Sequence, residues 1–214
     1  MAGVSWGGGE TPAYAGIINP ETIDLAGSAV GIIKNKANLL TDKKIKAGDR
    51  IIFLKSNGIN ANGLSLARAL AKKLPAGYST KLKTKTYGET LLTKSNIYAN
   101  LVQDLFKNKI DVHYLSNITG HGLRKVMRGR PNFTYMIEKV FAPQELFQFM
   151  QKVSGMNDYD MYQTFNMGQD YTIFVPAKDV TKTLKVIKQN KFTGLDAGYV
   201  AKGAKQVIIK PKNL

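Results

Sequence analysis

The chain has 214 residues, of which 43% are hydrophobic, and this is enough to bury a core in one large domain or two small ones. It contains no cysteine and only two histidines, which argues against disulfides, thiolate chemistry and a transition-metal site built from protein ligands. No apolar run approaches the length of a membrane span, and the first residues lack the basic and apolar regions of a signal peptide. We therefore expect a cytoplasmic protein with no membrane partner.

The formal net charge of +16 admits polyanionic partners. The lysines are spread over 34–46, 72–85, 178–191 and 202–212, and no aromatic platform for stacked bases accompanies them. A solvated basic surface is the favoured interpretation, and we do not expect a nucleic-acid partner. Attraction of small anionic substrates is the remaining alternative.

The predicted elements alternate between strands and helices, and no repeat or linker divides them. Gly/Asn-rich residues 56–63 connect an early strand to a helix that ends before Pro75. This order predicts an α+β fold (α/β layered), in which helices cover a mixed β-sheet. The expected strands are 23–33, 49–54, 110–115, 133–140 and 171–175, with a closing β pair at 197–201 and 206–209; the expected helices are 64–74, 95–107, 143–153 and 180–189.

The loop at 56–63 is a candidate phosphate site. Gly58 and Gly63 flank a segment that ends where the next helix begins, so free backbone N–H groups and the positive helix end converge there. Neutral side chains of this loop can bind ribose hydroxyls or an amidine: Ser56, Asn57, Asn60 and Asn62. From spacing alone, a turn that only satisfies local backbone geometry is the stronger interpretation.

Four ordered blocks together resemble the C-terminal half of the aminoimidazole ribonucleotide (AIR) synthetase family. They are Gly8-Gly9-Glu10-Thr11 with Asp24-Leu25-Ala26-Gly27, then Ser56 to Gly63, then Asn117-Ile118-Thr119-Gly120-His121-Gly122, and finally Asp160 to Gly168 with Thr164-Phe165-Asn166-Met167-Gly168 at its end. The resemblance implies the ATP-dependent cyclo-ligase of purine biosynthesis, which converts formylglycinamidine ribonucleotide to AIR.

The resemblance also implies how the chain is organised. Residues 1–22 would be an interdomain glycine loop, and 23–214 the substrate-side domain. A missing N-terminal half would hold ATP and Mg²⁺, so we expect the chain alone to bind neither tightly and to be inactive; a homodimer of the full-length form stays open. The implied nucleotide-proximal residues are Gly9, Glu10, Thr11 and Asp24. The phosphoribosyl substrate would contact the 56–63 loop together with Thr119, Gly120, Thr164 and Asn166.

The chain departs from the family pattern at several positions. Asn60 and Asn117 stand where the family has histidine, and asparagine cannot exchange a proton near neutral pH. His121 replaces a glycine, and we expect it to act as the titrating group, with a surface hydrogen bond as the alternative. Ala13 replaces an acidic residue, and Lys94 is the nearest cation where the family has an arginine.

These departures keep other functions open. We give His113, the other histidine, no functional role, because it alternates with its neighbours in a short predicted strand. The rivals to the cyclo-ligase are another enzyme of the wider superfamily, a non-catalytic binding or regulatory protein, and a basic nucleic-acid-binding module.

Overall fold

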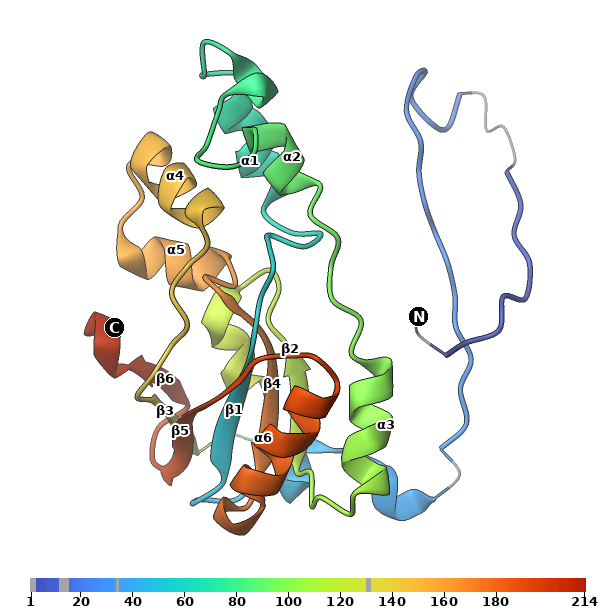
Figure 1. Cartoon of the computed structure of the whole chain (residues 1–214), viewed down its shortest axis with the longest axis vertical. Coiled ribbons are helices and arrows are strands. Elements are labelled where there is room, and N and C mark those ends of the chain that lie inside the picture. The colour runs from blue at the N-terminus through green and yellow to red at the C-terminus, as the bar shows by residue number, and fades with distance from the viewer. Residues whose placement is uncertain (1–2, 12–15, 34, 130–131) are drawn as a thin grey trace.

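Six strands form one mixed β-sheet in the order β2-β4-β1-β5-β3-β6 (Figure 1). The structure, a computed structural model, describes residues 3–11, 16–33, 35–129 and 132–214. Neighbouring strands are antiparallel except β3 and β6, which are parallel. The strands are β1 (Arg50–Lys55), β2 (Tyr114–Asn117), β3 (Phe133–Ile137), β4 (Gln169–Val175), β5 (Gly194–Lys202) and β6 (Gln206–Ile209).

Helices cover both faces of this sheet. None of those described is long and apolar enough to cross a membrane. The α-helices are α1 (Leu64–Ala71), α2 (Tyr87–Leu91), α3 (Ala99–Lys107), α4 (Glu145–Ser154), α5 (Asp158–Thr164) and α6 (Val180–Gln189). The 3-10 helices are η1 (Lys36–Asn38), η2 (Asp42–Lys44), η3 (Gly77–Ser79), η4 (Gly122–Arg128), η5 (Ala177–Asp179) and η6 (Lys210–Lys212).

Strand β1 shows why the sheet needs two helical layers. Successive side chains of a strand point to opposite faces, and four consecutive residues of β1 are fully buried. Ile51 and Phe53 join the larger core, to which α1, α4 and α5 contribute, whereas Ile52 and Leu54 pack with α3 and α6. The predicted α+β class, with a mixed sheet covered by helices, is confirmed.

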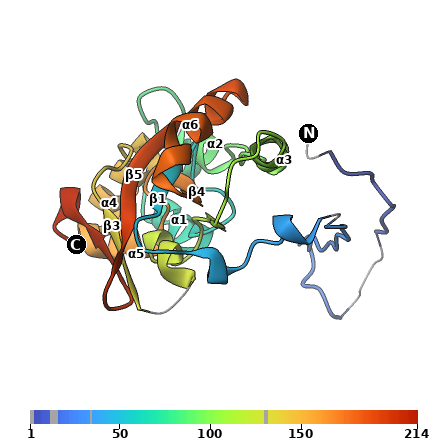
Figure 2. The ribbon, with the colours of Figure 1, turned by 90° about the horizontal axis from the view of Figure 1, so that it is seen from below.

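The first part of the chain forms an extended arm over 3–11 and 16–33, which projects away from the sheet in both views (Figures 1 and 2). Its apolar side chains are exposed: Trp6 by 87%, Leu25 by 89% and Val30 by 99%. The strand predicted over 23–33 is therefore wrong for this structure. A strand is stabilised by pairing with a neighbour, and this segment has none among the described strands.

Several other elements differ from the sequence-based expectation. Strand β2 lies later than the predicted 110–115, and α3 begins four residues after the predicted 95. The closing β pair is wrong, because β3 lies between β5 and β6. Helices α2 and α5 were not predicted; each is shorter than two full turns and begins with a side-chain cap, from Thr86 and Asn157 respectively.

Candidate functional site

The ends of three strands converge at one edge of the sheet and form a cleft. Strand β4 runs antiparallel to both β1 and β2, so the loops that follow β1 and β2 lie beside the start of β4. A cavity of about 560 Å³ opens there. Its polar lining includes Asn60 from the loop after β1, Asn117 from the end of β2, Thr119 from the loop after β2, Asp170 from β4, and Asn96 and Tyr98 from the segment before α3.

Asp170 is the centre of the polar network in this cleft. Its carboxylate accepts hydrogen bonds from Asn60 Nδ2 at 2.5 Å, from Tyr98 Oη at 2.5 Å and from Asn96 Nδ2 at 3.0 Å, and the residue is only 4% exposed. Burial and then the charge of Asp170 raise the pKa of Tyr98 far above its usual range, so its phenol stays protonated and donates. The network holds one carboxylate in a fixed position in the cleft wall.

The orientation of the Asn60 amide follows from this contact. A carboxylate only accepts hydrogen bonds, so the Asn60 NH₂ group must face Asp170 and its carbonyl oxygen must point elsewhere. That oxygen, Asn60 Oδ1, is buried and has no hydrogen-bond partner among the described residues, and Oδ1 of Asn62 is in the same state. Asn60 lines the cleft and Asn62 does not, so the cleft wall contains one buried, unpaired amide oxygen beside the Asp170 carboxylate, and such acceptors favour a ligand that carries N–H donors.

Hydrogen bonds within the predicted phosphate loop at 56–63, and from Asn166 to it, hold the shape of the loop. Ser56 Oγ donates to the Gly58 carbonyl at 2.8 Å and accepts from the Gly58 N–H at 3.2 Å. Asn166, which is fully buried, donates to the same carbonyl at 2.8 Å and accepts from the N–H of Gly168 at 3.0 Å. Asn57 donates to the Lys94 carbonyl at 2.6 Å. These polar groups are hydrogen-bonded to other protein groups, including the Gly58 N–H, which was expected to face an anion.

Gly63 is required by geometry at the start of α1. Its φ of +68° is a left-handed conformation, and a Cβ added there would lie 2.1 Å from the Phe165 ring. The 56–63 loop and the block around Phe165 therefore pack against each other, although they are about 100 residues apart in the sequence. Gly120 lies beside Asn62, and neither of these predicted site residues lines the cleft.

The structure does not bring His121 into the cleft. This exposed residue has a φ of +75° and precedes η4, where it lines a different cavity with Arg124 and Lys125. A hydrogen bond links the walls of the two cavities: Lys125 Nζ, in the wall of this cavity, donates to Thr119 Oγ1, in the wall of the cleft, at 2.6 Å. Lys125 is only 8% exposed, and burial followed by the nearby charge of Arg128 lowers its pKa.

The remaining predicted site residues lie outside the cleft lining. Thr164 ends α5 and is half-buried, and the predicted nucleotide-proximal residues are exposed on the arm, namely Gly9, Glu10, Thr11 and Asp24. Ala13 lies outside the described residues. No group of three or more histidine, aspartate or glutamate side chains that could hold a metal ion occurs within the described ranges.

The sequence reasoning missed Asp170, Asn96 and Tyr98. Asp170 comes two residues after the Thr164 to Gly168 block, outside the residues that carry the resemblance. Asn96 and Tyr98 belong to a segment whose departure from the family pattern is the lack of an arginine. The available signal was the position of Asp170 directly before the predicted strand 171–175, because a carboxylate buried there requires partners.

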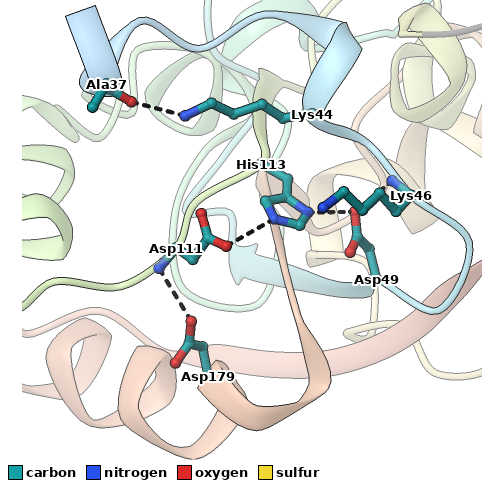
Figure 3. Close-up of polar contacts among 7 residues, drawn as sticks. All are labelled: Ala37, Lys44, Lys46, Asp49, Asp111, His113 and Asp179. Carbon is teal, nitrogen blue, oxygen red and sulfur yellow. Dashed lines mark hydrogen bonds and ion pairs between the residues drawn. The ribbon is translucent and has the colours of Figure 1, made fainter.

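His113 forms a second buried polar cluster away from the cleft (Figure 3). Its Nδ1 contacts Asp49 Oδ2 at 2.8 Å and its Nε2 contacts Asp111 Oδ2 at 3.1 Å. The Lys46 N–H donates to the same Asp49 oxygen at 2.8 Å. The cluster ties the segment that enters β1 to the segment that enters β2, which gives His113 a structural position.

Together, these observations define an α+β domain with a cleft whose polar lining consists of neutral amides, hydroxyls and one buried carboxylate. Residues 46–210 match the family model described as "AIR synthase related protein, C-terminal domain". The chain belongs to this family.

Two curated relatives of the chain carry the same name. The chain is 38% identical over 182 residues to the phosphoribosylformylglycinamidine cyclo-ligase of Methanocaldococcus jannaschii, covering 84% of this chain and 51% of that protein. It is 35% identical over 182 residues to the protein of the same name from Methanosarcina barkeri, with 84% and 53% covered. The chain thus spans about half the length of the curated relatives it matches.

A solved structure shares the fold at low sequence identity. Hydrogenase maturation protein HypE in complex with ATP superposes with a TM-score of 0.54 at 14% identity, over 79% of this chain and 49% of that one. This likeness supports the fold alone.

Proposed function

We propose that this chain is the substrate-side half of the ATP-dependent cyclo-ligase that converts formylglycinamidine ribonucleotide to AIR in purine biosynthesis. The observation that carries the proposal is the acceptor-rich cleft around Asp170. An amidine presents several N–H donors, and the Asp170 carboxylate with the unpaired Asn60 oxygen offers matching acceptors. The names of the relatives support the same substrate.

The cleft would act chiefly by positioning its substrate. In ring closure the attacking nitrogen and the activated formyl carbon belong to one molecule, so holding them in a reactive geometry supplies much of the rate. Asp170 is a carboxylate in the wall of the cleft, and we assign it the role of binding the amidine and accepting a proton from it. Asn60 and Asn117 would bind without titrating, and Thr119 would donate its hydroxyl hydrogen to the phosphoribosyl group.

We place ATP and Mg²⁺ in a preceding half of the protein. Two observations support this: the relatives are about twice as long as the match, and the arm at 3–11 and 16–33 exposes apolar side chains that a further domain would cover. The described residues contain no group suited to a metal. When bound, ATP would activate the formyl oxygen as a leaving group, and the residues named above would orient the reacting atoms.

A non-catalytic binding protein is the second candidate. It is favoured by the replacement of two histidines of the family pattern by Asn60 and Asn117, neither of which can transfer protons near neutral pH. Such a protein would use the same cleft to bind the substrate without closing its ring.

The two candidates are separated by a chimaera. The N-terminal half of the Methanocaldococcus jannaschii relative would be fused ahead of this chain, and AIR formation would be measured with and without ATP. We expect ATP-dependent turnover by the chimaera and none by either half alone. A folded chimaera that binds formylglycinamidine ribonucleotide without turnover would favour the binding protein, and one that does not bind it would contradict both.

A further inference from the structure

A second groove lies beside the 117–122 loop and is lined by several basic side chains. One part, of about 300 Å³, is lined by His121, Arg124, Lys125, Met127, Arg128 and Lys205. It shares Arg124, Met127 and Lys205 with an adjoining cavity of about 280 Å³. We call these two cavities together the basic groove.

The cations of the basic groove lack acidic partners. No aspartate or glutamate lines either cavity, and among the described residues none of its Arg or Lys side chains forms an ion pair with a carboxylate. Arg124 donates to Gln163 Oε1 at 3.0 Å, and the ammonium of Lys125 donates to a threonine hydroxyl. Lys125 is 8% exposed, and a cation withdrawn from water to that extent is costly without a counter-charge. A bound anion would supply the missing charge.

The adjoining cavity adds an apolar and aromatic surface. Leu123, Val207 and Ile209 line it, together with the rings of Tyr159 and Tyr162. Tyr159 is 57% exposed, so its ring is accessible to a ligand. Tyr162 is 2% exposed, and its hydroxyl is buried without a hydrogen-bond partner among the described residues. Tyr162 therefore contributes an aromatic surface to the cavity wall.

We infer that the basic groove binds an aromatic phosphate monoester. The phosphate would lie among Arg124, Lys125 and Lys205, where guanidinium and ammonium groups form charge-assisted hydrogen bonds. The aromatic body would lie in the adjoining apolar cavity, with Tyr159 at its rim. This site is separate from the Asp170 cleft and does not depend on the activity proposed for that cleft.

The groove is coupled to the cleft through Lys125. Its ammonium holds the hydroxyl of Thr119, which lines the cleft, while Lys125 itself lines the groove. A phosphate that draws Lys125 toward the groove would weaken its bond to Thr119. Occupancy of the groove would therefore alter the polar lining of the cleft.

Calorimetric titration of the chain with AMP tests the inference, since AMP joins a phosphate to an aromatic base. The test variant is the double substitution Arg124→Gln/Lys205→Gln, which alters the groove alone. The matched control is Lys182→Gln/Lys185→Gln on exposed positions of α6, which lowers the net charge equally. Losing one charge-assisted hydrogen bond raises the Kd about tenfold, so we expect at least this increase for the groove variant and an unchanged Kd for the control.

Three results would overturn the inference. The first is the absence of AMP binding by the parent. The second is an equal loss of affinity in both variants, which would indicate general attraction to a basic surface. The third is an unchanged affinity in the groove variant, which would place AMP elsewhere. Inorganic phosphate and adenosine, titrated separately, should each bind more weakly than AMP. Binding of phosphate as tight as that of AMP would contradict the role of the apolar cavity. The amide resonance of Thr119 should shift with AMP in the parent only, and an unmoved resonance would remove the coupling.

Discussion

Substitution of His113 by alanine is expected to destabilise the domain by about 3 kcal/mol. The side chains of His113 and Asp49 are 5% and 4% exposed, and their contact at 2.8 Å is a buried pair (Figure 3). Removing the partner of a buried group leaves that group short of a hydrogen bond, which costs about 1–3 kcal/mol for a neutral group and more for a charged one. Asp49 would still accept the Lys46 N–H, so we expect a loss of about 3 kcal/mol.

Thermal unfolding followed by circular dichroism measures this effect. For a protein of this size, a loss of 1 kcal/mol lowers the Tm by about 2–4 °C, so His113→Ala should lower it by about 6–12 °C. Asp111→Ala is the control, because the Asp111 side chain is 57% exposed and an exposed ion pair contributes only about 0–1 kcal/mol. Equal Tm shifts for the two variants would refute the assignment of the stability to the buried His113–Asp49 contact.

Three further predictions concern packing, pH and catalysis. Gly63→Ala should lower the free energy of unfolding by about 1–3 kcal/mol in urea titrations, because its methyl group would meet the Phe165 ring; an unchanged midpoint would contradict this packing. Burial raises the pKa of Tyr87 and of Tyr162 to about 12 each, so the stability they contribute is complete below pH 10 and lost as the pH rises to about 12; stability that is constant across this window would exclude the effect. In an active chimaera, Asn60→His should add a transition near pH 6–7 to the kcat profile, and an unaltered profile would place residue 60 outside the proton path.

Sequence periodicity was sufficient for β1 and α1, two of the elements that form the core. The buried run of β1 and the spacing of Ala67, Leu70 and Ala71 in α1 are local patterns, and the structure confirms both elements. The pairing of strands was harder to predict from the sequence, because the position of β3 between β5 and β6 depends on contacts between segments that are distant in the chain. The exposed run at 23–33 has the composition of a strand, but composition does not supply a neighbour to pair with.

The cleft was predicted only in part. Asn60, Asn117 and Thr119 line one cavity, because the strands that precede or contain them are neighbours of β4; their roles in binding stay predictions. Asp170 could not be found by the same route, since its partners Asn96 and Tyr98 lie more than 70 residues away in sequence. The direction in which a loop side chain points depends on backbone angles, and the positive φ of His121 turns it toward the basic groove.

The kcat of the chimaera with Asp170→Asn tests the central claim most directly. Asparagine keeps the shape of the side chain but cannot accept a proton, so kcat should fall by about 10²-fold or more, as general acid–base contributions usually require. The exposed Asp160→Asn substitution is the matched control and should leave kcat unchanged. A kcat that is retained in Asp170→Asn but lost in His121→Ala would contradict the account and assign proton transfer to the histidine.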